Sequence, residues 1–132
     1  MSAKIRKLKV VSIVSNGHEV IMGKRIDNGL WEFPGGKMEL NEGVMEAGLR
    51  ELEEETGIVP DTYEFITFFD KPDKIVWVYR GMTDEEPEDM EPDKHLYFRY
   101  IGVGRFNRMM GNSNVTKETI TIHELMENDS YV

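Results

Sequence analysis

Apolar and β-branched residues gather in short stretches that alternate with turn-forming segments along the chain. Residues 8–15 (LKVVSIVS) and 19–25 (EVIMGKR) are rich in Val and Ile, which favours strands. The dipeptide Asn16-Gly17 between them is a strong signal for a tight hairpin turn. Aromatic and β-branched stretches predict three more strands farther along: 63–70 (YEFITFFD), 74–81 (KIVWVYRG) and 95–103 (HLYFRYIGV).

The pattern changes to a helical repeat from Glu42 to Thr56. Gly57 then stands where a helix commonly ends with a residue in the left-handed conformation. One face of this helix carries apolar side chains on successive turns, together with a glycine that permits close backbone approach: Met45, Gly48, Leu49 and Leu52. We expect this face to pack on the core.

The second half of the chain contains a long loop and an ambiguous tail. Residues 82–94 (MTDEEPEDMEPDK) are acidic and contain two prolines, which predicts a loop. In the tail, residues 118–122 (ETITI) suit a strand and residues 123–128 (HELMEN) suit a short helix. Strands around one strong helix predict a mixed α/β (α+β) fold, and the length fits a single domain over residues 1–132.

Composition narrows the classes of function. A net charge of −9 disfavours binding to the nucleic-acid backbone, which depends on Lys and Arg. The absence of cysteine excludes disulfides, thiolate chemistry and cysteine-based zinc sites. We find no apolar run long enough to cross a bilayer and no signal peptide at the start. These features lead us to expect a cytoplasmic protein without membrane contacts.

Glutamates crowd the end of the predicted helix. Glu51, Glu54 and Glu55 share one face, since they stand three and four positions apart, whereas Glu53 points away. A solvated acidic face is one interpretation, and a divalent-cation site is the other. The acids adjoin the apolar face and follow a glycine-rich segment, so we favour the cation site. Carboxylates without Cys or His select Mg²⁺, with Mn²⁺ as a substitute.

The residues around this helix resemble the signature of the Nudix hydrolase family, the Nudix box. The segment just before the helix, residues 31–37 (WEFPGGK), is similar to the MutT-type branch of that family. The resemblance implies the Nudix fold, a mixed β-sheet in an α/β/α sandwich. The matching positions occur at the family's spacing: Gly36, Glu42, Arg50, Glu51, Leu52, Glu54, Glu55, Gly57 and Ile58.

The resemblance also implies roles for individual residues. Arg50 would orient a catalytic glutamate through a salt bridge, and Glu42 would support the loop or reach the metals through water. The implied metal cradle consists of one backbone carbonyl and three carboxylates: Gly36, Glu51, Glu54 and Glu55.

A carboxylate must accept the proton of the attacking water. Glu51 and Glu54 on the helix are candidates, and so are the acids of residues 82–94, among which Glu91 ranks first because it lies near the following strand. The alternative for this loop is a solvated connection, the usual role of a charge run. The predicted catalytic residues are Arg50, Glu51, Glu54 and Glu91.

Residues that contact substrate are less constrained by the sequence. The predicted set is Arg25, Trp31, Phe33 and Gly35, with core packing as the alternative for Trp31 and Phe33. Weaker candidates for the far side of the pocket, or for base recognition, are Tyr97, Tyr100, Arg105, Arg108 and Asn112 or Asn114. The histidines show no ligand spacing, and we interpret them as structural or exposed: His18, His95 and His123.

The implied reaction is Mg²⁺-dependent hydrolysis of a nucleoside diphosphate linked to another group, X. The MutT-like segment makes a nucleoside triphosphate, cleaved to its monophosphate and pyrophosphate, the first expectation. ADP-ribose and dinucleoside polyphosphates are alternatives. A non-catalytic nucleotide-binding module is the competing hypothesis, but retention of every glutamate of the box favours catalysis. We expect a small-molecule nucleotide substrate, no bulk nucleic acid, and a monomer or homodimer.

Overall fold

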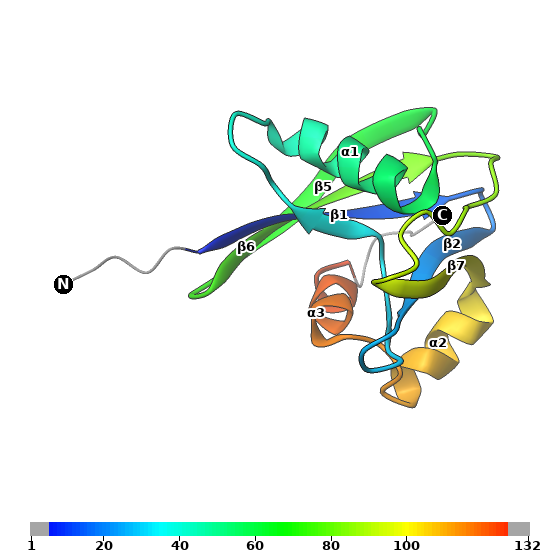
Figure 1. The fold of residues 1–132 in the computed structure, drawn as a ribbon. Coiled ribbons are helices and arrows are strands. Elements are labelled where there is room, and N and C mark those ends of the chain that lie inside the picture. Colours follow the sequence, from blue (N-terminus) through cyan, green and yellow to red (C-terminus); the bar gives the residue numbers. More distant parts are fainter. Residues whose placement is uncertain (1–5, 127–132) are drawn as a thin grey trace.

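Helices cover both faces of a mixed sheet in the computed structural model, which describes residues 6–126 (Figure 1). Helix α1 (Val44–Thr56) lies on one face. Helices α2 (Val103–Gly111) and α3 (Lys117–Leu125) lie on the other. The predicted fold class, a mixed sheet between helical layers, is confirmed. Among the described residues, none of the helices is long and apolar enough to span a membrane.

The five strands predicted between residues 8 and 103 are present, and two further short strands precede α1. The sheet has the order β3-β2-β1-β6-β5, with β4 beside β1 and β7 beside β2. The strands are β1 (Lys7–Ser15), β2 (Glu19–Arg25), β3 (Trp31–Glu32), β4 (Gly35–Lys37), β5 (Thr62–Lys71), β6 (Lys74–Met82) and β7 (His95–Gly102).

Strands β1 and β2 pair with each other only beside the turn that connects them. The Asn16 side chain accepts hydrogen bonds from the backbone N–H groups of His18 and Glu19, and the strands pair at Ser15 and Val20. Beyond this point β1 runs parallel to β6, while β2 pairs antiparallel with β7. Residues 31–37 enter where β1 and β2 separate, because β3 pairs with β2 and β4 pairs with β1. The predicted hairpin therefore opens into a split sheet.

Helix α1 ends as predicted, and Gly48 and Leu52 of the predicted inward face are buried. Gly57 adopts the left-handed conformation (φ 77°) and donates its backbone N–H to the carbonyl of Glu53. Met45 was expected in the core but is 46% exposed, so that prediction is wrong. The helix approaches β1 closely at Gly48, which places small side chains and carboxylates at the interface. The buried residues of α1 are Ala47, Gly48, Glu51, Leu52, Glu55 and Thr56.

The tail is helical, so the predicted strand at residues 118–122 is wrong. The hydroxyl of Thr116 caps α3 by accepting the backbone N–H of Thr119. Thr119, Ile122 and Met126 are buried at helical spacing, and this packing outweighs the strand preference of β-branched residues. The predicted short helix at residues 123–128 is the end of α3 as far as Leu125, and residues 127–128 lie outside the described part.

An ion triplet fixes α3 beneath the sheet. Glu118 of α3 accepts hydrogen bonds from the ammonium groups of Lys9 on β1 (3.0 Å) and Lys74 on β6 (2.8 Å). Burial alone would raise the pKa of Glu118, but the two lysines outweigh burial and lower it. The carboxylate is therefore held charged in the folded protein.

We expect Glu118→Gln to lower the free energy of unfolding by about 2 kcal/mol at neutral pH, because hydrogen bonds to charged groups are lost. Because the pKa of Glu118 is lower in the folded protein than its ordinary value of 4.5, the charged carboxylate stabilises the fold at pH values above 4.5. This stabilisation is lost as the pH falls through the folded-state pKa. Urea unfolding at a series of pH values should show the variant and the parent converge in acid. Glu124→Gln, an exposed site on the same helix, is the control; an equal loss there would contradict the role of the triplet.

Candidate metal and substrate site

A carboxylate cluster forms where the loop of residues 83–94 meets the end of α1. One oxygen each of Glu51, Glu54 and Glu91 lies within 4.8 Å of the others. The loop is attached to the helix, since the backbone N–H groups of Glu88 and Met90 donate to the carbonyls of Thr56 and Glu55. These bonds satisfy carbonyls that a helix end leaves free. The structure thus brings the loop acid Glu91 to the helix acids.

Arg50 ties the cluster to the segment that precedes α1. Its guanidinium donates to Glu42 (2.6 Å), Glu51 (3.1 Å) and Glu54 (3.1 Å), and also to the backbone carbonyl of Lys37. The hydrogen bond from Arg50 lowers the pKa of Glu42. Because a single guanidinium pairs with three carboxylates, the group of charges around Arg50 keeps a net negative charge.

The two buried carboxylates of α1 have different surroundings. Burial raises the pKa of Glu51, although the ion pair with Arg50 opposes this shift. Burial also raises the pKa of Glu55 well above its usual range. Glu55 accepts the backbone N–H of Gly35 at 2.9 Å, and its other oxygen lies 3.6 Å from Nδ1 of His95. Glu55 therefore lies beside the glycine segment and outside the three-oxygen cluster.

The cluster has the chemistry of a hard-cation site. All three donors are carboxylate oxygens, the ligands preferred by Mg²⁺ and Mn²⁺. Among residues 6–126, Oε1 of Glu91 is buried without a hydrogen-bond partner, as expected of an atom that awaits a ligand. A side chain at Gly36 would collide with the carboxylate of Glu51, so only glycine leaves this space open. The residues present fit a divalent cation.

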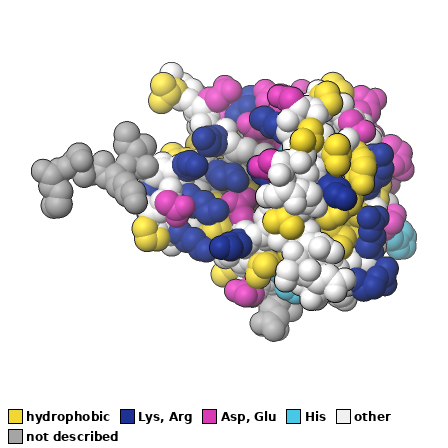
Figure 2. All heavy atoms as spheres, turned by 60° about the horizontal axis from the view of Figure 1, so that its bottom comes forward, with side chains coloured by type: hydrophobic (Ala, Val, Ile, Leu, Met, Phe, Trp, Pro, Cys, Tyr) yellow, Lys and Arg dark blue, Asp and Glu magenta, His cyan; other side chains and the backbone are white. Residues whose placement is uncertain are grey.

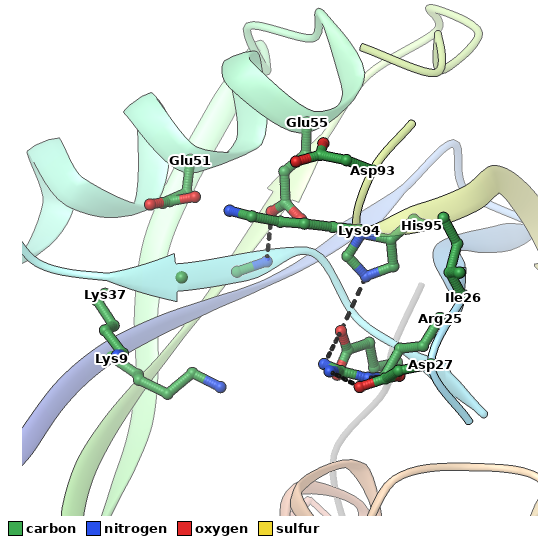
Figure 3. Close-up of a pocket in the computed structure, with 13 residues that line it drawn as sticks. Lys9, Arg25, Ile26, Asp27, Lys37, Glu51, Glu55, Asp93, Lys94 and His95 are labelled. Atoms are coloured by element: carbon green, nitrogen blue, oxygen red, sulfur yellow. Dashed lines mark hydrogen bonds and ion pairs between the residues drawn. The ribbon is translucent and has the colours of Figure 1, made fainter. Parts of the chain in front are cut away.

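A cavity of about 560 Å³ adjoins the cluster at the place where the sheet splits (Figure 3). Basic side chains line it together with acidic ones, although the chain carries a net charge of −9. Lys and Arg side chains also gather on the face of the molecule in Figure 2. The cavity is lined by Lys9, Arg25, Ile26, Asp27, Glu32, Gly35, Gly36, Lys37, Glu51, Glu55, Asp93, Lys94 and His95.

Comparison with known proteins identifies the family. The family model of the NUDIX domain matches residues 5–116. The chain belongs to the Nudix family. This confirms the predicted membership in the Nudix hydrolases, and Glu51 and Glu54 thus lie in a Nudix box within a Nudix domain.

Relatives with assigned names agree with this membership. The chain is 34% identical over 68 residues to an ADP-ribose pyrophosphatase from Methanocaldococcus jannaschii, a match that spans 49% of this chain and 40% of the relative's length. Its fold is similar to that of a MutT NUDIX hydrolase from Burkholderia pseudomallei (TM-score 0.78, 24% identity, covering 92% of this chain and 98% of the other). It is also similar to a bifunctional NMN adenylyltransferase/ADP ribose pyrophosphatase from Francisella tularensis, complexed with AMP and a Mn ion (TM-score 0.74, 21% identity, covering 95% and 42%).

His95 of this Nudix domain was missed by sequence reasoning as a site residue. It is buried in the cavity wall, where Nε2 lies 2.8 Å from the Glu32 carboxylate and Nδ1 faces Glu55. Glu32 also pairs with Arg25, which in turn binds Asp27. Histidine spacing gave no signal because the partners come from β3 and α1. Only the position of His95, directly after the acidic loop, hinted at this placement.

The predicted substrate residues divide between the cavity and the core of the Nudix domain. Arg25 and Gly35 line the cavity. Trp31 packs against Tyr97, with 5.6 Å between the ring centroids, and the guanidinium carbon of Arg105 lies over the Trp31 ring, 5.1 Å from its centroid. Phe33 stacks on Phe106. Both aromatic residues are buried in the core, the alternative considered for them.

Three of the weaker candidates lie outside the lining of the cavity. The hydroxyl of Tyr100 donates to the carbonyl of Glu85. Asn112 follows the end of α2, and the carbonyl of Asn114 accepts the backbone N–H of Trp31. Among the residues that line the cavity, none of these three is found.

Proposed function

We propose that the chain hydrolyses the pyrophosphate bond of a nucleoside diphosphate linked to X, with Mg²⁺ or Mn²⁺ as the required cation. The observation that carries this proposal is the position of the carboxylate cluster at a cavity that basic side chains line together with acidic ones. The acids can hold a cation, and the lysines complement the charge of a diphosphate. Membership in the Nudix family supports the same reaction.

Each residue of the cluster has a role in this proposal. Glu51, Glu54 and Glu91 would hold the cation, which when bound neutralises phosphate charge and lowers the pKa of water. Arg50 fixes Glu51 and Glu54 through its hydrogen bonds. Gly36 keeps the approach to Glu51 open. Glu91 is also the candidate general base, since its Oε1 has no hydrogen-bond partner among the described residues and could accept a proton where it does not bind the cation.

The cavity walls favour a sugar as the group X. Asp27, Glu32 and Asp93 line the cavity, and carboxylates accept hydrogen bonds from sugar hydroxyls but repel a third phosphate. We therefore propose ADP-ribose or a similar nucleoside diphosphate sugar as the substrate. The name of the M. jannaschii relative supports this choice. A nucleoside triphosphate is the second candidate, favoured by the MutT-like segment at residues 31–37.

Product release from a nucleotide panel tests the proposal. ADP-ribose, the four dNTPs, a dinucleoside polyphosphate and NADH would each be incubated with Mg²⁺, Mn²⁺ or EDTA. We expect cation-dependent conversion of ADP-ribose to AMP and ribose 5-phosphate, and none with EDTA. Faster turnover of a dNTP would select the second candidate. Nucleotide binding by thermal shift without release from any compound would contradict catalysis and favour a binding module.

A further inference from the structure

Lys94 is the last residue of the loop that carries Glu91. Its ammonium lies 3.3 Å from Oε2 of Glu91. Figure 3 shows its side chain extended across the cavity, with the ammonium directed toward Glu51 and beside Glu55. Lys94 is therefore a cation that the chain itself places among the acids of the candidate metal site.

The charges around the cluster explain why such a cation is needed. The guanidinium of Arg50 pairs with Glu51 and Glu54 but also with Glu42. Among the described residues, Glu91 pairs with Lys94 and not with Arg50. Carboxylates this close repel one another, and Glu51 is largely removed from water. Without a metal ion, the remaining negative charge has to be balanced by another group nearby. The ammonium of Lys94 is placed to do so.

We propose that Lys94 is the built-in counter-ion of the carboxylate cluster in the metal-free protein and that a divalent cation displaces it. The inference rests on the proposed cation site and does not depend on the identity of the substrate. The side chain is 59% exposed, so its ammonium can leave the cluster without disturbing the core. A lysine and a metal ion that compete for the same oxygens are linked: each weakens the binding of the other by the same factor.

Manganese binding without substrate tests this inference directly. The electron paramagnetic resonance signal of free Mn²⁺ would give the dissociation constant for the parent, for Lys94→Met and for Lys37→Met. Methionine removes the charge while keeping much of the apolar stem. We expect Lys94→Met to bind Mn²⁺ at least about fivefold more tightly, the lower range of coupling between linked sites. Lys37 lines the same cavity but makes none of the ion pairs found among residues 6–126, so its variant is the matched control and should change less.

Thermal unfolding with and without Mn²⁺ separates competition from simple repulsion. A displaced counter-ion stabilises only the metal-free protein, so Lys94→Met should have a lower Tm without metal and the parental Tm at saturating Mn²⁺. If Lys94 merely repelled the metal, Lys94→Met would have the parental Tm without metal and a higher Tm than the parent at saturating Mn²⁺. That result would overturn the inference. An unchanged Mn²⁺ affinity would also overturn it.

These measurements are independent of turnover. If no nucleotide is hydrolysed but Lys94→Met still binds Mn²⁺ more tightly and is destabilised only without metal, the counter-ion role stands and catalysis fails. If the parent binds no Mn²⁺, both the cation site and the counter-ion role are overturned.

Discussion

Glu51→Gln is expected to lower kcat by on the order of a thousandfold. A metal ion supplies several kcal/mol of stabilisation to the transition state, and each 1.36 kcal/mol corresponds to a factor of ten in rate. Glutamine keeps the size of the side chain but removes the charge that would hold the cation. Glu51 also accepts a hydrogen bond from Arg50 and lies directly against Gly36. The measurement is steady-state turnover of the preferred nucleotide at saturating Mg²⁺.

Glu53→Gln is the matched control for this experiment. Glu53 is an exposed glutamate of the same helix turn and does not face the cluster, so the same substitution there should leave kcat within about twofold. The Glu51 variant should remain folded, because burial already disfavours the charged form of Glu51. Urea unfolding without metal should therefore show equal or higher stability for Glu51→Gln. Near-normal turnover of a folded Glu51→Gln protein would exclude the proposed cation site.

Gly48→Ala is expected to destabilise the fold by about 2 kcal/mol, the usual range for overpacking. In an exposed helix the same change would stabilise by about 1 kcal/mol, because alanine has the higher helix propensity. Here a β-carbon would collide with the hydroxyl of Tyr63 and lie 2.8 Å from Cγ1 of Val10. Tyr63 cannot move aside freely, since its hydroxyl is bonded to Ser12 and its ring stacks on Tyr79. Urea unfolding measures the sign of the change.

Two further variants separate the collision from helix propensity. Gly111→Ala lies at the end of α2, where a β-carbon would meet nothing within 4 Å, and it should be neutral or stabilising. Adding Tyr63→Phe to Gly48→Ala removes the colliding hydroxyl and should recover part of the lost stability. A stabilising effect of Gly48→Ala alone would show that α1 is packed less closely on the sheet than described.

Local spacing was sufficient to predict the acidic face of α1. Positions three and four apart on a helix are neighbours whatever the rest of the fold does. Helix spacing did not determine which face turns inward, as the exposure of Met45 shows. That depends on how closely the helix approaches β1, and the approach at Gly48 is a tertiary property.

The rest of the site depends on contacts between distant segments. His95 meets Glu32 and Glu55 only because β7 pairs with β2 and the glycine segment enters the split sheet. The placement of Glu91 required the loop to bond to the end of α1, and an acidic composition cannot distinguish that from a solvated loop. The strand propensity of residues 118–122 was overridden by their packing beneath the sheet.

The split sheet also has a consequence for folding kinetics. The longest ladder that β1 makes is its parallel pairing with β6, and the two strands are separated by about half the length of the chain. The entropy of closing so long a loop must be overcome before these contacts form, which slows folding relative to proteins with mainly local contacts. The helix α1 and the glycine segment both lie within that loop. A nascent chain therefore cannot complete the cavity and the acidic cluster until β6 and the residues that follow it as far as His95 have been synthesised, so the cluster is assembled late.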